Sequence, residues 1–189
     1  SPGSQRLRFG RVWNSFDRRW RFSFRQFAKY LKTGSDGFIH TIHIHRENGH
    51  VVSFYRDRGD DWKSDKDVRA RIEQDDDLWR FMLSSGQAEW YDDSGRLSRI
   101  AYVGGDAIDV QYGVSEIRVQ DAYGNELVVT TDAHGRVIEM TDPDGEIYRY
   151  AYNHDDNVQH VGFPDNTRVA GGNPFGEDNP YRTYHYEDA

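Results

Sequence analysis

Hydrophobic and polar residues alternate along much of this chain in short runs, and residues that favour turns separate the runs. Within residues 38–45, Ile42 and Ile44 alternate with His43 and His45. Residues 19–24 place Trp20, Phe22 and Phe24 on one face. Period-two alternation bounded by Gly, Asn or Asp is typical of β-strands. Turns between strands are expected at Asp36-Gly37, Asn48-Gly49 and Asp144-Gly145.

One segment could instead be read with helical spacing. Within 62–82, Val68, Ile72 and Leu78 fit the period of a helix, but the run Asp75–Asp77 interrupts it. The chain is also rich in aromatic residues, at 14%, and aromatic and β-branched residues favour strands. The sequence therefore predicts an all-β fold, with a helix over 62–82 as the less favoured alternative.

A seven-residue phrase recurs in the second half of the chain. It reads YDDSGRL at 91–97, TDAHGRV at 131–137 and YNHDDNV at 152–158, and a variant with the aspartate first, DAYGNEL, occupies 121–127. The first residues of the three closest copies are 40 and 21 positions apart, which is roughly two periods and one. A fixed period of this length indicates a repeat architecture.

The phrase also predicts a local structure. Asp92 and Asp132 lie three residues before Gly95 and Gly135, and Asp can accept hydrogen bonds from its own turn while Gly supplies a positive φ. After each Gly we expect strict alternation, with residues 97 and 99 on one face and 98 and 100 on the other, and likewise 137 and 139 against 138 and 140. Residues 113–161 are thus predicted to be short antiparallel strands joined by two-residue turns.

Composition narrows the classes of function. The 189 residues contain no cysteine, which excludes disulfides and cysteine-bound zinc but leaves the compartment open. The sequence shows neither an apolar run long enough to cross a bilayer nor a secretory signal. The net charge of −8 combines +5 over residues 1–80 with −13 over residues 81–189. A basic stripe at 6–32 could contact nucleic acid, but an acidic chain repels phosphate, so we expect it to face acidic protein surface.

The chain divides into two regions by composition. Residues 5–90 are aromatic and basic, and residues 91–189 carry the repeats, with a loop-like insertion rich in Pro and Gly at 164–180. The stretch Tyr184–Asp188 echoes residues 150–153, as though another unit were beginning. This pattern predicts a fragment of a longer protein.

Side chains with possible chemistry are present but poorly arranged for it. His43 and His45 are two apart on one predicted strand face and could share a metal ion with His40 or His50, yet a polar outer face explains them as well. The aspartates at 60–61 and 75–77 lack the alternate spacing of a calcium loop, and Asp142 and Asp144 lack a later acidic ligand. We therefore expect no metal, no cofactor and no catalytic residue.

The repeated phrases resemble the tyrosine-aspartate (YD) repeats of Rhs proteins. The resemblance rests on YDDSGRLSRI, TDAHGRVIEMTDPDGEIYRYAYN and YHYED. More loosely, GRVWNSFDRRW at 10–20 is similar to the start of an Rhs core, and residues 43–62 and 78–97 are similar to the strand pairs that precede the first repeats. Thr131, Asn153 and Asn157-Val158 depart from the common form. Asp142-Pro143 matches only the first half of the family's self-cleavage motif and is interpreted as a hairpin turn.

The resemblance implies a structural role. It implies antiparallel β-hairpin repeats that form a curved or spiralling sheet, part of the shell of a bacterial polymorphic toxin that encloses and delivers a C-terminal toxin. The partners implied are the remainder of the shell, the toxin and a secretion-system spike protein, with export by a specialised system such as type VI secretion. The alternatives are a β-domain that binds carbohydrate or a cell-surface partner through aromatic residues, and an enzyme built around the histidines. The residues given structural roles are Tyr91, Asp92, Gly95, Arg96, Asp132, Gly135, Arg136, Tyr150 and Tyr152.

Overall fold

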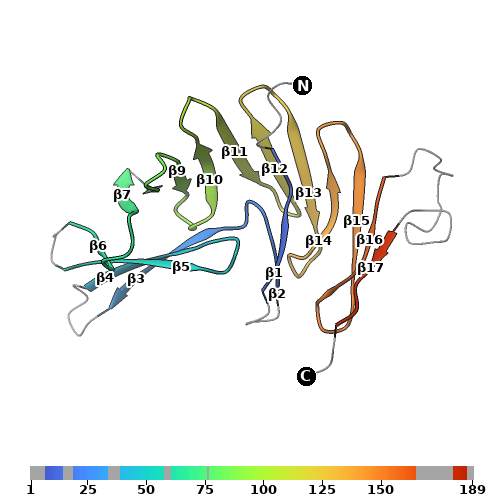
Figure 1. Cartoon of the computed structure of the whole chain (residues 1–189), viewed down its shortest axis with the longest axis horizontal. Helices are drawn as coiled ribbons and strands as arrows, with labels where there is room; N and C mark the ends of the chain where they lie inside the picture. Colours follow the sequence, from blue (N-terminus) through green and yellow to red (C-terminus); the bar gives the residue numbers. More distant parts are fainter. Residues whose placement is uncertain are drawn as a thin grey trace. The chain divides into compact units, whose positions relative to one another are not determined.

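A computed structural model describes residues 7–14, 19–33, 39–57, 61–75, 77–164 and 181–186. Over these residues the structure consists of β-strands, turns and irregular segments, and it contains no helix (Figure 1). The prediction of an all-β fold with antiparallel hairpins is confirmed. The turn expected at Asp36-Gly37 and nearly all of the 164–180 insertion lie outside the described residues.

The segment 62–82 is built from strands, so the helical alternative is wrong. The residues that fit a helical period fall in separate elements, with Val68 in an irregular segment and Ile72 in a strand that pairs with the next. Cross-strand pairing thus overrides a spacing that only three residues supported. The strands are β6 (Lys63–Ser64), β7 (Arg71–Asp75) and β8 (Leu78–Met82).

The chain folds into two compact units. The first comprises Ser1–Val110 with Asp121–Tyr123, and the second comprises Gln111–Gln120 with Gly124–Ala189. The first copy of the repeated phrase lies in the first unit, and the copies at 131–137 and 152–158 lie in the second.

The first unit opens with a short hairpin and a four-stranded sheet. The hairpin pairs β1 (Arg11–Asn14) with β2 (Arg19–Phe22). Strand β2 ends at Phe22, so the strand predicted over 19–24 is too long. Phe24 is buried but has a φ of 65°, which a continuing strand does not allow. The four-stranded sheet is formed by β3 (Phe27–Thr33), β4 (Ile39–His45), β5 (Val51–Asp57) and β6.

A second sheet of the first unit packs against the four-stranded sheet. It continues from β7 and β8 through antiparallel neighbours in chain order. Phe54 of the four-stranded sheet meets Phe81 of the second sheet edge to face, with ring centroids 6.0 Å apart, and Tyr30 meets Trp79 at 5.3 Å. These aromatic contacts and the buried Ile42 form the core between the two layers. The further strands are β9 (Ala88–Tyr91), β10 (Leu97–Ala101) and β11 (Ala107–Tyr112).

The second unit is an antiparallel meander in which each strand pairs with its neighbours in sequence (Figure 1). Its buried residues are mainly aliphatic, and each strand from β12 to β16 supplies at least one of them. The strands are β12 (Glu116–Asp121), β13 (Glu126–Thr131), β14 (Val137–Thr141), β15 (Ile147–Tyr152), β16 (Val158–Gly162) and β17 (Tyr181–Thr183).

Candidate functional site

The repeated phrase forms the same turn in each of its three closest copies. At 91–97, the amide of Asp92 donates to the carbonyl of Arg96 at 2.8 Å, and the amide of Gly95 donates to the carbonyl of Asp92 at 2.8 Å. The Asp92 carboxylate accepts the Arg96 amide at 2.8 Å and the Arg96 Nε at 3.0 Å. Gly95 has a φ of +79°. The aspartate therefore holds both ends of a tight loop, and the glycine supplies its left-handed residue.

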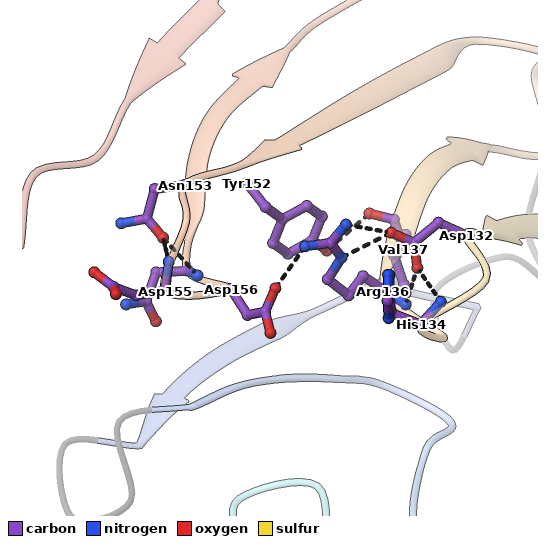
Figure 2. Close-up of polar contacts among 9 residues, drawn as sticks. Asp132, His134, Arg136, Val137, Tyr152, Asn153, Asp155 and Asp156 are labelled. Carbon is purple, nitrogen blue, oxygen red and sulfur yellow. Dashed lines mark hydrogen bonds and ion pairs between the residues drawn. The ribbon is translucent and has the colours of Figure 1, made fainter.

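The copy at 131–137 has the same bonds with further donors (Figure 2). One oxygen of Asp132 accepts the backbone amides of His134 and Arg136, each at 2.9 Å, and the other accepts Nε of Arg136 at 2.7 Å. Partial burial opposes the charge, but these amides and the guanidinium stabilise the ionised form and lower the pKa of Asp132 below its ordinary value. Gly135 again has a positive φ, of 75°.

The copy at 152–158 keeps this turn with different residues. Asn153 takes the place of the aspartate, and its Oδ1 accepts the amides of Asp155 at 3.1 Å and Asn157 at 2.9 Å. Asp156 occupies the glycine position with a φ of 61°. A non-glycine residue in this conformation is uncommon, although Asp and Asn tolerate it better than most residues. The turn geometry is thus set by the fold and does not require the consensus residues at every position.

The turns after β13, β14 and β15 are longer than the two-residue turns predicted for this region, whereas the turn between β11 and β12, where the amide of Gly113 donates to the carbonyl of Glu116 at 2.7 Å, encloses two residues as predicted. In the turn after β13, Thr131 pairs with Val137, and Asp132 is hydrogen-bonded to Arg136. These two pairs enclose a three-residue loop that ends in Gly135, whose φ is positive. This arrangement is a type I turn followed by a glycine bulge. The Asp142-Pro143 segment forms the same turn, with the amide of Glu146 2.9 Å from the Asp142 carboxylate, so its interpretation as a hairpin turn is confirmed.

The strict alternation predicted after Gly95 and Gly135 is also wrong. The register shifts one residue into the strand, so that Ser98, Ile138 and Gln159 each lack a partner of their own opposite β9, β13 and β15. Such a bulge places the next two residues on the face opposite to that expected. As a result the buried residues lie three apart, in the pairs Leu97 and Ile100, Val137 and Met140, and Val158 and Val161.

The tyrosine of one repeat contacts the bulge of the repeat before it. The Tyr152 hydroxyl donates to the carbonyl of Val137 at 2.8 Å (Figure 2), and the Tyr186 hydroxyl donates to the carbonyl of Val158 at 2.6 Å. Both carbonyls belong to the aliphatic residue that starts a bulged strand, where the ladder of backbone hydrogen bonds is locally disrupted. The resemblance between Tyr184–Asp188 and residues 150–153 therefore extends to this contact. Tyr150, which lies between Arg149 and Ala151 in β15, is buried in the core.

Arg136 links two successive turns of the second unit. Its guanidinium lies 5.0 Å from the ring centroid of Tyr152 and donates to the Asp156 carboxylate at 2.5 Å, while it also pairs with Asp132 (Figure 2). The hydrogen bond and charge of Asp132 are the first cause of a raised pKa for Arg136, and Asp156 adds to it. The unusual aspartate at position 156 is therefore one end of a bridge between repeats.

One cluster of charged residues was not singled out by the sequence. The Glu89 side chain is fully buried in β9 and accepts hydrogen bonds from the Arg46 guanidinium, from Gln87 at 2.9 Å and from the Tyr91 hydroxyl at 2.6 Å. Arg46 also lies 5.2 Å from the centroid of Phe81. The sequence did contain a signal for this position, because Glu89 is two residues before Tyr91 and therefore shares its inward face of the strand. A charge on an inward face needs a buried partner.

The cluster joins the two layers of the first unit. Arg46 belongs to the turn between β4 and β5, and Glu89 belongs to β9. The hydrogen bonds and charge of Glu89 raise the pKa of Arg46 although burial opposes its charge. Burial and the neighbouring Glu89 raise the pKa of Tyr91 far above its ordinary value, so that Tyr91 acts here as a hydrogen-bond donor.

The histidines and the aspartate runs do not assemble into a metal site in the described part of the chain. No group of three or more His, Asp or Glu side chains there could hold a metal ion. His43 and His45 lie on the outer face of the four-stranded sheet, opposite the buried Ile42 and Ile44, as the alternation predicted. Within the described residues there is also no helix that could serve as a membrane span.

The turns, bulges and tyrosine contacts define a β-hairpin repeat protein. Residues 132–168 match the family model described as RHS Repeat. The matched segment contains the Asp132 turn, the Asp142 turn and the Asn153 turn. The predicted resemblance to the Rhs/YD-repeat family is thereby confirmed, and this chain carries an RHS repeat. No curated protein matches the chain in a sequence comparison.

Proposed function

We propose that this chain is a non-enzymatic part of the wall of an Rhs-type shell that encloses and delivers a C-terminal toxin. The observation that carries the proposal is the contact between repeats: Tyr152 and Arg136 fasten one hairpin to the next through the Val137 carbonyl and Asp156. A module that bonds to its own successor can be extended indefinitely side by side, and a long twisted sheet of this kind curves. An RHS repeat itself implies a structural role in a larger assembly.

The mechanism in this proposal is steric. The meander satisfies backbone hydrogen bonds from strand to strand, and the side-chain contacts fix the spacing of successive turns. A continuous wall of such strands would keep an enclosed domain away from its targets until the wall opens. RHS-repeat proteins are typically extracellular or at the cell surface. We propose that this one is exported by a specialised secretion system, with a spike protein and the rest of the shell as partners.

The product of the complete reading frame provides the test. Electron microscopy of that protein should show a hollow particle, and the polypeptide that follows the repeats should resist added protease while the particle is intact. Replacing Arg136 and Tyr152 together by Ala should expose that polypeptide, whereas Val114→Ser, at a fully exposed position, should not. A solid particle, or a C-terminal region that protease removes from the intact wild-type protein, would contradict the proposal.

A further inference from the structure

The outer face of the four-stranded sheet brings a set of basic side chains together. The register places Lys29 of β3 opposite His43 of β4, and His43 opposite Ser53 of β5. In the next outward-facing row, Phe27 lies opposite His45, and His45 lies opposite Val51. His45 is partly exposed, so protons can reach it from solvent.

The two histidines are held by specific contacts. The His45 ring stacks on Phe27 with centroids 4.1 Å apart and planes 8° from parallel. The His43 ring meets the His45 ring edge to face at 6.4 Å, and its Nδ1 lies 2.8 Å from the Ser53 hydroxyl. Phe27 is the first residue of β3, so the stack with His45 holds the beginning of that strand to β4.

The charges around His45 oppose its protonation. Burial lowers the pKa of His45 below its ordinary value of 6.5, and the neighbouring His43, Lys29 and Arg21 lower it further. The carboxylates carried by the β4–β5 hairpin are Glu47, in its turn, and Asp57, at the far end of β5, and both are exposed. The groups packed against His45 from β2, β3 and β4 are thus basic or aromatic.

We propose that His45, stacked on Phe27 across the β3–β4 pairing and beside His43, is an acid-sensitive switch that weakens the pairing of β3 with β4 as the pH falls below neutrality. Protonation of His45 places a positive charge beside Lys29 and Arg21, and separation of β3 from β4 relieves its repulsion from Lys29. An unfolded or separated strand takes up a proton near the ordinary pKa of histidine, whereas the paired strands resist it. The stability of this pairing is therefore complete above about pH 6.5 and decreases as the pH falls.

The switch would act on a strand that also contacts the repeats. The amide of Ala28 in β3 donates to the carbonyl of Gly95, in the first repeated turn, at 2.7 Å. Acidification would therefore loosen the docking of the four-stranded sheet on that turn. This inference does not depend on the proposed shell, because it concerns the stability of the first unit alone.

Proton NMR of the 189-residue chain tests the proposal directly. The ring resonances of His45 should titrate with a midpoint below 6.5. Hydrogen-exchange protection of the β3 and β4 amides, corrected for intrinsic rates, should decrease several-fold between about pH 7.5 and about pH 5. Protection of β14–β16 should decrease less. A midpoint at or above 6.5, or an equal loss of protection in both units, would overturn the proposal.

Two variants distinguish protonation of His45 from other effects of acid on the first unit. His45→Phe preserves an aromatic partner for Phe27 and removes the titrating group, so the extra loss of protection in β3 and β4 at acid pH should shrink. His134→Gln replaces an exposed histidine of the second unit and should leave that loss unchanged. If His45→Phe and wild type lose protection equally, the switch does not reside in His45.

Discussion

Gly95 and Ala28 approach each other more closely than any larger residue at position 95 would allow. A Cβ at Gly95 would lie 2.0 Å from the carbonyl oxygen of Ala28, and the Ala28 amide bonds to the Gly95 carbonyl at 2.7 Å. An antiparallel bridge between Phe27 and Arg96 flanks this contact. The first repeated turn is therefore a docking point for β3 as well as a hairpin.

This contact predicts that two glycines of the same turn type differ in their tolerance of alanine. Gly95→Ala introduces a clash with backbone and a left-handed alanine, whereas Gly145→Ala introduces only the latter, because nothing lies within 4 Å of a Cβ at Gly145. A left-handed non-glycine residue costs roughly 1–2 kcal/mol. Urea unfolding should show a decrease of that size in the free energy of unfolding for Gly145→Ala. Gly95→Ala should show a clearly larger decrease or fail to fold. Equal losses would show that β3 does not dock on the turn.

The tyrosine contact between repeats predicts a modest and local effect. Tyr152→Phe leaves the ring in place beside Arg136 but removes the donor to the Val137 carbonyl. Loss of such a hydrogen bond costs about 0.5–1.5 kcal/mol. Thermal unfolding should report this loss for Tyr152→Phe, and hydrogen exchange should locate it in β14 and β15. Tyr55→Phe, at a side chain that is 47% exposed, serves as the control and should have little effect.

Sequence reasoning located the repeated turns because their signal is local. Aspartate, glycine and arginine within five residues specify both the loop and its hydrogen bonds, so Asp132, Gly135 and Arg136 lie where the phrase predicts. The bulges at Ser98, Ile138 and Gln159 were missed because a bulge is a property of the pairing between strands, which the phrase alone does not show. The Arg46–Glu89 pair was missed because its members are 43 residues apart and on different sheets.

Asp132 predicts a dependence of stability on pH. Its pKa is lowered in the folded chain, so its contribution is present above the unfolded value of about 3.8 and is lost as the pH falls through the folded value. Asp132→Asn keeps an oxygen for the two backbone amides, as Asn153 does naturally, but removes the charge pair with Arg136. We expect Asp132→Asn to be less destabilising than Asp132→Ala at neutral pH.

The dependence of the free energy of unfolding on pH in the acid range then provides the sharper test. Wild type should lose stability between about pH 5 and about pH 2, and Asp132→Asn should lose less over the same interval. Asp144→Asn, at an exposed position in the turn of the same type after β14, is a matched control and should retain the wild-type slope. The assignment would fail if Asp132→Asn and Asp144→Asn changed the acid dependence equally.

The buried Arg46–Glu89 pair predicts strong coupling between the two layers of the first unit. Glu89→Gln leaves the partly buried Arg46 guanidinium without its carboxylate partner, and Arg46→Met leaves a fully buried carboxylate that Gln87 and Tyr91, among the described residues, still contact. Removing one partner of a buried ion pair typically costs about 3–5 kcal/mol, whereas replacing both by apolar residues can be nearly neutral. Arg46→Met with Glu89→Met should therefore recover much of the stability that either single change removes.

The exposed pair of Arg99 and Asp109, at 2.8 Å, provides the comparison. A double-mutant cycle on that pair should give a coupling energy of at most about 1 kcal/mol. Additive losses at Arg46 and Glu89, measured by thermal unfolding, would mean that this pair does not couple the two layers.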